Sequence, residues 1–190
     1  RAALDAGFTS LMYDGSRKPL TQNIDETAAI AEMARDAGIS CEGEIGFVGY
    51  ANGDNSTGTD PDEAARFARD SGVDAMAISC GNVHLQEDKQ GGLDVARIKA
   101  IEAVTDLPLV IHGGSGVPVA QRMQLAAESR ICKFNIGTEL RMAFGQALRA
   151  AVTADATRFD RVQILRETAD PVKVAAMRVL TAFGAPDLRT

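Results

Sequence analysis

Short apolar runs alternate with longer amphipathic stretches along this chain. The runs have the length of β-strands, and most begin after Gly or Asp and end at small polar residues. They are TSLMYDG (residues 9–15), ISCEGEIG (39–46), DAMAISCG (74–81), LPLVIHGG (107–114) and ICKFNIGT (131–138). The stretches between and after them repeat apolar residues at helical spacing and cover residues 21–38, 60–72, 93–104, 118–129 and 138–152. This alternation predicts a parallel sheet with right-handed crossovers.

Local signals mark several helix ends. Asp60 followed by Pro61 is typical of a helix start, because proline is well tolerated at the first helical position. The opening RAALDAGF is typical of the last turn of a helix that ends at Gly7, so we expect the chain to begin inside a domain. A last helix is expected from about Pro171 to Phe183.

Polar residues gather where the predicted strands end, at intervals of one β/α unit: Asp14, Glu44, Asn82 to His84, His112 and Asn135. In a (β/α)8 barrel these ends meet at one mouth, where such enzymes perform chemistry. An open Rossmann-type sheet also binds ligands at this edge, but no GxGxxG follows an early strand. We therefore predict an α/β fold. If it is a TIM barrel, this chain shows about five of its β/α units (strands four to eight), and about three units are absent. Residues 1–190 are expected to form a single domain, the C-terminal portion of that barrel.

Charge and cysteine content limit the partners and the cellular location expected for this protein. The 190 residues carry a formal net charge of −6, which argues against nucleic acid or an anionic membrane as the main partner. The three cysteines form no CxxC motif, so a reduced, cytoplasmic protein is expected. No apolar run approaches the length needed to span a bilayer.

Both histidines of the chain fall at strand ends. Taken separately, His84 in SCGNVHLQ and His112 in VIHGGSG are each compatible with a structural or surface role. Together they form a candidate metal pair, because neutral imidazole is the commonest metal ligand and catalytic zinc usually takes three protein ligands. The third ligand would be Glu44, Cys80 or a residue outside this chain.

Two glycine-containing turns are candidate phosphate sites. In HGGSG, the backbone of Gly113 and Gly114 can turn N–H groups toward an anion, the Ser115 hydroxyl can donate, and a helix starting near Pro118 adds its positive dipole. A plain βα turn that needs positive φ angles explains the same glycines.

The second turn, FNIGTEL, repeats this arrangement one strand later. Asn135 ends the strand, Gly137 permits close approach of a ligand, and Thr138 caps the next helix. Phosphate often binds between the last two βα loops of a barrel. The alternative is that Thr138 serves only as this helix N-cap, with Glu139 in the first turn.

Two carboxylates share one face of a predicted inner strand. Glu42 and Glu44 are two residues apart in CEGEIG, so their side chains point to the same side. Burying both is costly unless they serve water, a metal or a cation.

These residues resemble the class II, zinc-dependent ketose-bisphosphate aldolases, especially the fructose- and tagatose-bisphosphate branch. The matching stretches follow the family's order over almost the whole chain: ALDAGFTSLMYDGS, EGEIG, GNVH, LDVARIKAI, PLVIHGGSG, KFNIGTEL and DPVKVAAMRVLTAFG. The resemblance implies a (β/α)8 barrel that reversibly cleaves a ketose 1,6-bisphosphate to dihydroxyacetone phosphate and an aldehyde. It also implies a homodimer or homotetramer.

Site roles follow from the same resemblance. His84 and His112 match zinc ligands, and Glu44 matches a glutamate that serves an alternate metal position. The phosphate-binding segments match Gly113, Gly114, Ser115, Gly137 and Thr138, and Asn135 matches the residue that binds the dihydroxyacetone hydroxyls. The cofactor would be Zn²⁺, with Co²⁺ or Fe²⁺ as alternatives and a monovalent cation as an addition.

The chain departs from the family pattern in three places. The family's H-x-D-H-type stretch, with a further zinc histidine and the proton-shuttling aspartate, is expected upstream of Arg1, so the chain by itself is not expected to be a competent aldolase. Leu85 stands where the family usually has glycine, and Lys89 lies one step from the usual lysine. The loop after EIG reads GFVGY instead of containing G-G. Two other functions therefore stay open: an aldolase for another phosphorylated keto-sugar, and a non-catalytic phosphosugar-binding barrel.

Overall fold

The computed structural model describes residues 1–51, 53–87 and 92–184. Contacts divide the chain into two compact units, Arg1–Asn135 and Ile136–Thr190. The first unit holds the sheet, and the second holds two long helices. That residues 1–190 form a single domain stays a prediction.

The first unit is built on a five-stranded parallel sheet whose strand order follows the sequence, β1-β2-β3-β4-β5. The strands are β1 (Ser10–Tyr13), β2 (Ser40–Ile45), β3 (Ala75–Ile78), β4 (Leu109–Ile111) and β5 (Ile131–Phe134). All five predicted strands are thus confirmed. Sequential parallel neighbours are the pairing that repeated β/α units produce.

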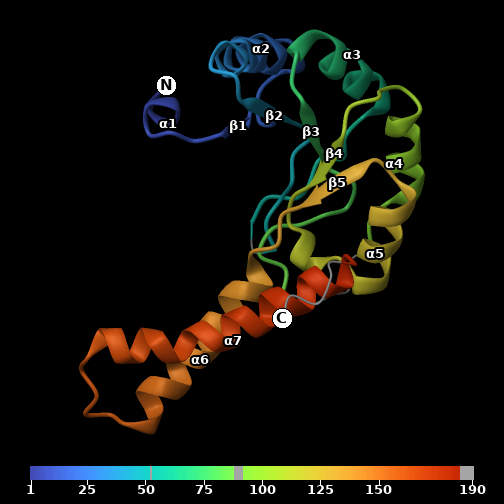
Figure 1. Ribbon diagram of the computed structural model, residues 1–190. Helices are drawn as coiled ribbons and strands as arrows, with labels where there is room; N and C mark the ends of the chain where they lie inside the picture. Colours follow the sequence, from blue (N-terminus) through green and yellow to red (C-terminus); the bar gives the residue numbers. More distant parts are fainter. Residues whose placement is uncertain (52, 88–91, 185–190) are drawn as a thin grey trace. The chain divides into compact units, whose positions relative to one another are not determined.

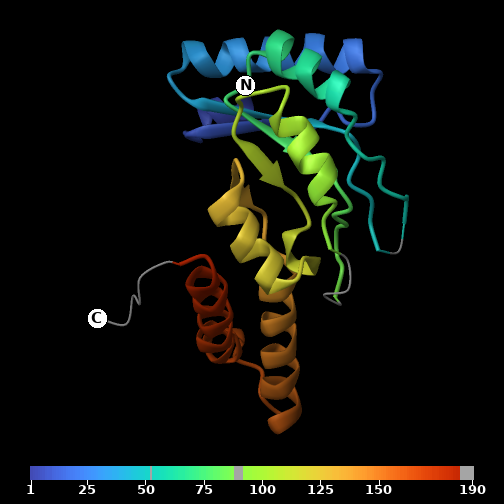
Figure 2. The same ribbon diagram turned by 90° about the vertical axis from the view of Figure 1, so that its right-hand side faces the viewer.

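Helices accompany the strands in the expected alternation: α1 (Ala2–Asp5), α2 (Leu20–Asp36), α3 (Pro61–Ser71), α4 (Val95–Glu102) and α5 (Val119–Glu128). Helices α2 to α5 lie along one side of the curved sheet (Figure 1), and α2 and α3 pack side by side (Figure 2). Among the described residues, no helix has the length and apolar character needed to cross a bilayer.

The strands present an apolar face to the helices and a polar one to the other side. Met76 and Ile78 of β3 and Leu109 and Ile111 of β4 belong to the apolar core together with residues of α2 to α5. Strand side chains alternate between faces, so Glu42, Glu44 and Lys133 project from the opposite face. Register supports this, because Glu44 pairs with Ala77, Ala77 with Val110, and Val110 with Lys133.

The predicted helix start at Asp60 is confirmed. The Asp60 carboxylate accepts hydrogen bonds from the backbone N–H groups of Asp62 and Glu63 at 2.9 and 3.1 Å, and Pro61 is the first helical residue. The short helix α1 precedes Gly7, whose φ of +81° fits the predicted helix end.

The second unit is a pair of helices, α6 (Thr138–Ala154) and α7 (Arg161–Ala182), that pack against each other. The predicted start of the last helix, near Pro171, was wrong. Helix α7 begins ten residues earlier, at Arg161, where the Asp160 side chain caps the N–H of Val162, and Pro171 lies inside the helix. Proline has no N–H to donate, so an interior proline interrupts the hydrogen-bond ladder without always ending the helix.

Candidate active site

His112 lies directly after β4 and is held between two glutamates. Its Nε2 is 2.9 Å from Glu42 Oε1, and its Nδ1 is 3.0 Å from Glu44 Oε2. All three side chains are more than nine-tenths buried. The two carboxylates predicted to share a face of β2 therefore share a single imidazole, one at each ring nitrogen.

Lys133 completes this cluster from β5. Its Nζ lies 2.6 Å from Glu42 Oε2, and its side chain is about half exposed. Two carboxylates thus face one lysine and one imidazole, so the formal charges cancel when the imidazole is protonated. Such pairing compensates for the cost of burying charge on the polar face of the sheet.

The surroundings of His112 favour its charged form. Burial alone would lower the pKa, but hydrogen bonds to Glu42 and Glu44 outweigh it and raise the pKa of His112 to about 9. Burial likewise opposes ionisation of Glu42, but contacts with His112 and Lys133 hold its pKa below the usual value. Both shifts favour the ion pair between the His112 imidazolium and the Glu42 carboxylate at neutral pH.

His84 lies in the loop after β3, close to His112. The two ring centroids are 6.0 Å apart, and the rings are tilted by 44°. The backbone around His84 is tied to the loop after β2, because His84 N–H donates to Gly49 O at 2.8 Å and Ala51 N–H donates to His84 O at 3.0 Å. Tyr50 from that loop has its ring centroid 5.0 Å from the His84 ring.

Asn82 fastens the loop that carries His84 to the end of β4. Its Oδ1 accepts from Cys80 N–H at 2.7 Å, and its Nδ2 donates to Ile78 O and to His112 O at 3.2 and 2.9 Å. This buried amide thus joins the two strand ends, with two hydrogen bonds at the end of β3 and one at the end of β4.

The HGGSG segment forms a tight buried turn before α5. Gly113 has a φ of +63°, and residues Gly114–Gly116 form one 3₁₀ turn. The Gly114 N–H donates to Asn135 O at 3.1 Å, so this amide is engaged within the fold and joins the turn to the end of β5. The turn thus brings together Gly113, Gly114, Ser115 and Asn135, four of the six predicted phosphate and substrate residues.

The remaining two predicted binding residues, Gly137 and Thr138, belong to the second unit. Gly137 occupies the N-cap position of α6, and Thr138 is the first residue inside the helix. The predicted N-cap position of Thr138 was therefore wrong, because the chain already turns into the helix at Gly137. Lys89 lies outside the described residues.

The donor types fit a zinc-type ion, since two imidazoles stand beside a carboxylate. The arrangement falls short of a full ligand set, because among residues 1–51, 53–87 and 92–184 there is no group of three or more His, Cys, Asp or Glu placed to hold a metal. Both ring nitrogens of His112 contact carboxylates, so metal binding requires one contact to open and the ring to lose a proton. The set of His84, His112 and Glu44 stays a prediction.

Cys80, the alternative third ligand, belongs to the apolar core. Its side chain is buried among the residues packed between sheet and helices, and burial raises the pKa of its thiol to about 12. A thiol must lose its proton to bind a metal, so this environment disfavours Cys80 as a ligand.

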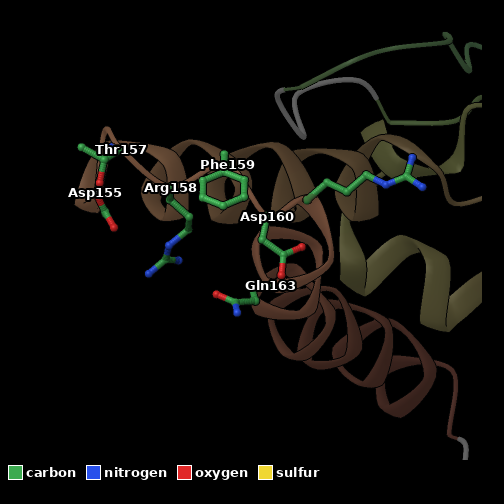
Figure 3. A pocket seen from close by; sticks show the side chains of 7 residues that line it. Asp155, Thr157, Arg158, Phe159, Asp160 and Gln163 are labelled. Carbon is green, nitrogen blue, oxygen red and sulfur yellow. Dashed lines mark hydrogen bonds between the residues drawn. The ribbon is translucent and has the colours of Figure 1, made fainter.

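A separate pocket lies in the second unit, around the connection between α6 and α7 (Figure 3). The predicted site residues do not line it. Its wall consists of Asp155, Thr157, Arg158, Phe159, Asp160, Arg161 and Gln163.

Comparison with known proteins now identifies the class of protein. The family model of class II fructose-bisphosphate aldolases matches residues 1–187. The chain belongs to this family. It is 33% identical over 189 residues to a fructose-bisphosphate aldolase of Geobacillus stearothermophilus, covering 97% of this chain and 66% of the relative.

Two further proteins are similar to this chain over almost its whole length. The chain is 35% identical over 188 residues to a 6-phospho-5-dehydro-2-deoxy-D-gluconate aldolase of Shouchella clausii (strain KSM-K16), covering 97% of this chain and 64% of that protein. The crystal structure of the YdjI aldolase from Escherichia coli K12 superposes with a TM-score of 0.78 at 32% identity, over 98% of this chain and 64% of that one. The chain thus spans 64 to 66% of the length of these relatives.

The structural likeness also confirms the predicted fold class. The similar solved structures are aldolases of the TIM-barrel type, and this chain supplies five consecutive parallel β/α units of that architecture.

Sequence reasoning gave no role to Lys133, Asn82 or Tyr50. Lys133 carried a usable signal, because a lysine within an otherwise apolar strand needs a partner on the same face. Asn82 was noted at a strand end, but its partners depend on how the loop after β3 meets the end of β4. Tyr50 carried no signal, since its position beside His84 depends on how the loops after β2 and β3 meet.

Proposed function

We propose that the intact protein catalyses the reversible, metal-dependent aldol cleavage of a ketose 1,6-bisphosphate to dihydroxyacetone phosphate and an aldehyde. The main observation behind this proposal is that the ring of His84 and the buried Glu44 both lie close to His112. His112 is followed directly by the Gly113–Ser115 turn. Membership of the class II aldolase family supports the same reaction type.

Each part of this constellation has a proposed task. His84 and His112 hold the divalent cation, with Glu44 as the nearby carboxylate. The Gly113–Ser115 turn, followed directly by the N-terminus of α5, binds the substrate phosphate. Asn135 orients the hydroxyls of the dihydroxyacetone portion, and its carbonyl oxygen is already fixed by Gly114 N–H. Gly137 and Thr138 contribute further phosphate contacts.

These tasks divide the catalytic work between binding and charge stabilisation. A phosphate held at the turn positions the reacting carbons relative to the histidines, which lowers the entropic part of the barrier. A bound divalent cation would polarise the ketone and stabilise the enediolate left after carbon–carbon cleavage. We propose zinc as the divalent metal, with cobalt(II) or iron(II) as alternatives and a monovalent cation as an additional cofactor.

Metal removal tests this proposal. The intact protein is assayed with fructose and tagatose bisphosphates before and after exhaustive chelation, and again after addition of zinc or cobalt(II). We expect cleavage to disappear with the metal and to return with it. His112→Ala should abolish cleavage, whereas the exposed control Arg69→Ala should leave it intact. Cleavage that persists without metal contradicts the proposal.

A second candidate is an aldolase for another phosphorylated keto-sugar. Two observations favour it: Leu85 replaces a usual glycine next to His84, and a relative at 35% identity is named a 6-phospho-5-dehydro-2-deoxy-D-gluconate aldolase. A substrate panel separates the two. Turnover of that keto-sugar phosphate with both bisphosphates inert would favour the second candidate. Failure of every substrate would favour a non-catalytic phosphosugar-binding barrel.

Assembly and location are part of the same proposal. We propose a homodimer or homotetramer, as the family resemblance implies, and a cytoplasmic location, as the cysteine content indicates. Sedimentation equilibrium of the intact protein tests the assembly, and a monomer at micromolar concentration would contradict it.

A further inference from the structure

Glu42 is the buried carboxylate of the site to which the proposed function gives no task. We propose that Glu42, anchored by Lys133, is a positioning residue that fixes the imidazole ring of His112. This inference rests on the proposed metal-dependent function, because a fixed ring matters most when it must present one nitrogen to a cation.

Both oxygens of Glu42 are engaged, each by a different strand. Oε1 lies 2.9 Å from His112 Nε2 beyond the end of β4, and Oε2 lies 2.6 Å from Lys133 Nζ on β5. The carboxylate on β2 therefore reaches across the polar face of the sheet and is held from both sides. A side chain held at both oxygens has little freedom to rotate, so it can define the orientation of the ring it contacts.

Glu44 differs from Glu42 in this respect. It contacts the other nitrogen of the same ring, Nδ1, at 3.0 Å, whereas Lys133 is paired with Glu42. Displacing Glu42 would separate it from a lysine as well as from the imidazole, so the Glu44 contact is the easier one to open. We therefore expect Nε2–H to stay donated to Glu42 and Nδ1 to be the nitrogen that exchanges its partner.

The physical role of such a carboxylate is well defined. A histidine ligand usually donates its second ring N–H to a carboxylate or carbonyl, which fixes tautomer and ring orientation. Buried ion pairs, in contrast, often add little net stability compared with apolar residues of the same size. Orientation of His112 is therefore the better explanation for burying Glu42 and pairing it with the half-exposed Lys133.

Cobalt(II) binding to the purified intact protein tests the inference. Loss of an orienting partner typically weakens metal affinity by about 10- to 100-fold. We expect Lys133→Met to show a loss of up to this size and an altered visible absorption spectrum of the bound cobalt, because Glu42 loses its anchor and holds the ring less firmly. Lys133→Arg, which retains the cation, should restore both affinity and spectrum.

A matched control comes from the other end of the first unit. Lys18 Nζ also lies 2.6 Å from a glutamate oxygen, Glu26 Oε2, but at the start of α2. Lys18→Met removes an ion pair of the same kind and should leave the cobalt affinity and spectrum unchanged. If Lys133→Met does not fold, Glu42→Gln replaces it, since this isosteric change removes the charge that holds Lys133.

The outcomes separate the two proposals. Unchanged cobalt affinity and spectrum in Lys133→Met, or in Glu42→Gln, would overturn the positioning role while the proposed function stands. An equal loss in Lys133→Arg and Lys133→Met would also overturn it, because the retained cation then has no effect. A wild-type protein that binds no cobalt would overturn both.

Discussion

The backbone of Gly113 lies directly against the carbonyl group of Val83. A Cβ atom added to Gly113 would stand 2.4 Å from Val83 O, and the φ of Gly113 is +63°. The start of the glycine-rich turn is therefore packed closely against the loop that carries His84, with no room for a side chain between them. The turn and the histidine loop therefore have to keep their present spacing.

Gly113→Ala should therefore destabilise the protein more than an alanine at a glycine that has a similar positive φ but no atoms close to the added Cβ. Gly38 is the matched control, because its φ is +69° and an added Cβ would have no neighbour within 4 Å. A left-handed alanine costs about 1–2 kcal/mol, and overpacking adds about 1–3 kcal/mol. We expect only the first cost for Gly38→Ala and both for Gly113→Ala in urea unfolding. Equal losses would show that the loop yields to the methyl group.

Leu85 is a non-glycine residue held in the left-handed region, with a φ of +58°, immediately after His84. Its side chain is half exposed, so burial compensates little for the strain. We expect Leu85→Gly to raise the free energy of unfolding by about 0.5–1 kcal/mol, the steric cost less the entropy that glycine gains in the unfolded chain. Leu85→Ala keeps the backbone strain and serves as the control. If Leu85→Ala stabilises the protein as much as Leu85→Gly does, the strain comes from the leucine side chain and not from the backbone conformation.

The stability of the first unit should decrease in acid because of Glu26. Hydrogen bonds from Lys18, Tyr13 and Gln22 lower the pKa of Glu26 from 4.5 to about 2. A depressed folded-state pKa contributes stability above the unfolded value, and this stability is lost as the pH falls from about 4.5 through about 2.

The acid response is measured by urea unfolding between pH 5 and pH 2. The wild-type protein should lose more stability over this range than Glu26→Gln, which cannot titrate. Glu32→Gln, on an exposed position of the same helix, keeps the Lys18–Glu26 pair and should follow the wild type. Parallel acid curves for wild type and Glu26→Gln would refute the expectation.

The three cysteines should differ sharply in reactivity. Burial raises the pKa values of the Cys41 and Cys80 thiols, that of Cys80 to about 12, whereas Cys132 is exposed on β5. At pH 8, a thiol with a pKa near 12 is a thiolate in about one molecule in ten thousand, and the thiolate is the reactive form. We expect one fast-reacting thiol in the native protein and three after denaturation. Cys132→Ser should remove the fast phase, and rapid labelling of Cys80 would contradict its buried position.

The sequence by itself determined the elements and their order. The five apolar runs became five strands, and Asp60 with Pro61 began a helix as expected, because these features depend on residues close together in the chain. The start of α7 was the exception. The last helix was expected to start near Pro171, but the side-chain cap at Asp160 favours an earlier start. Propensity alone does not decide between a proline at a helix start and a proline inside a helix.

The candidate site was determined in part by the sequence. Strand-end positions brought His84, His112 and Glu44 to one edge of the sheet, since parallel strands all end there. Glu42 and Glu44 were expected on the same face, which two-residue periodicity guarantees. A turn with positive φ angles was the alternative interpretation of HGGSG, and Gly113 has a positive φ.

Only the tertiary structure decided the partners of these residues. Which carboxylate contacts Nε2 of His112 and which contacts Nδ1 depends on the register of β2 against β4 and on the ring's rotation about its side-chain bonds. The pairing of Glu42 with Lys133 joins residues 91 positions apart and requires the whole sheet between them. Periodicity fixes the face on which a side chain lies, but the partner it meets there is set by packing between strands that are distant in the sequence.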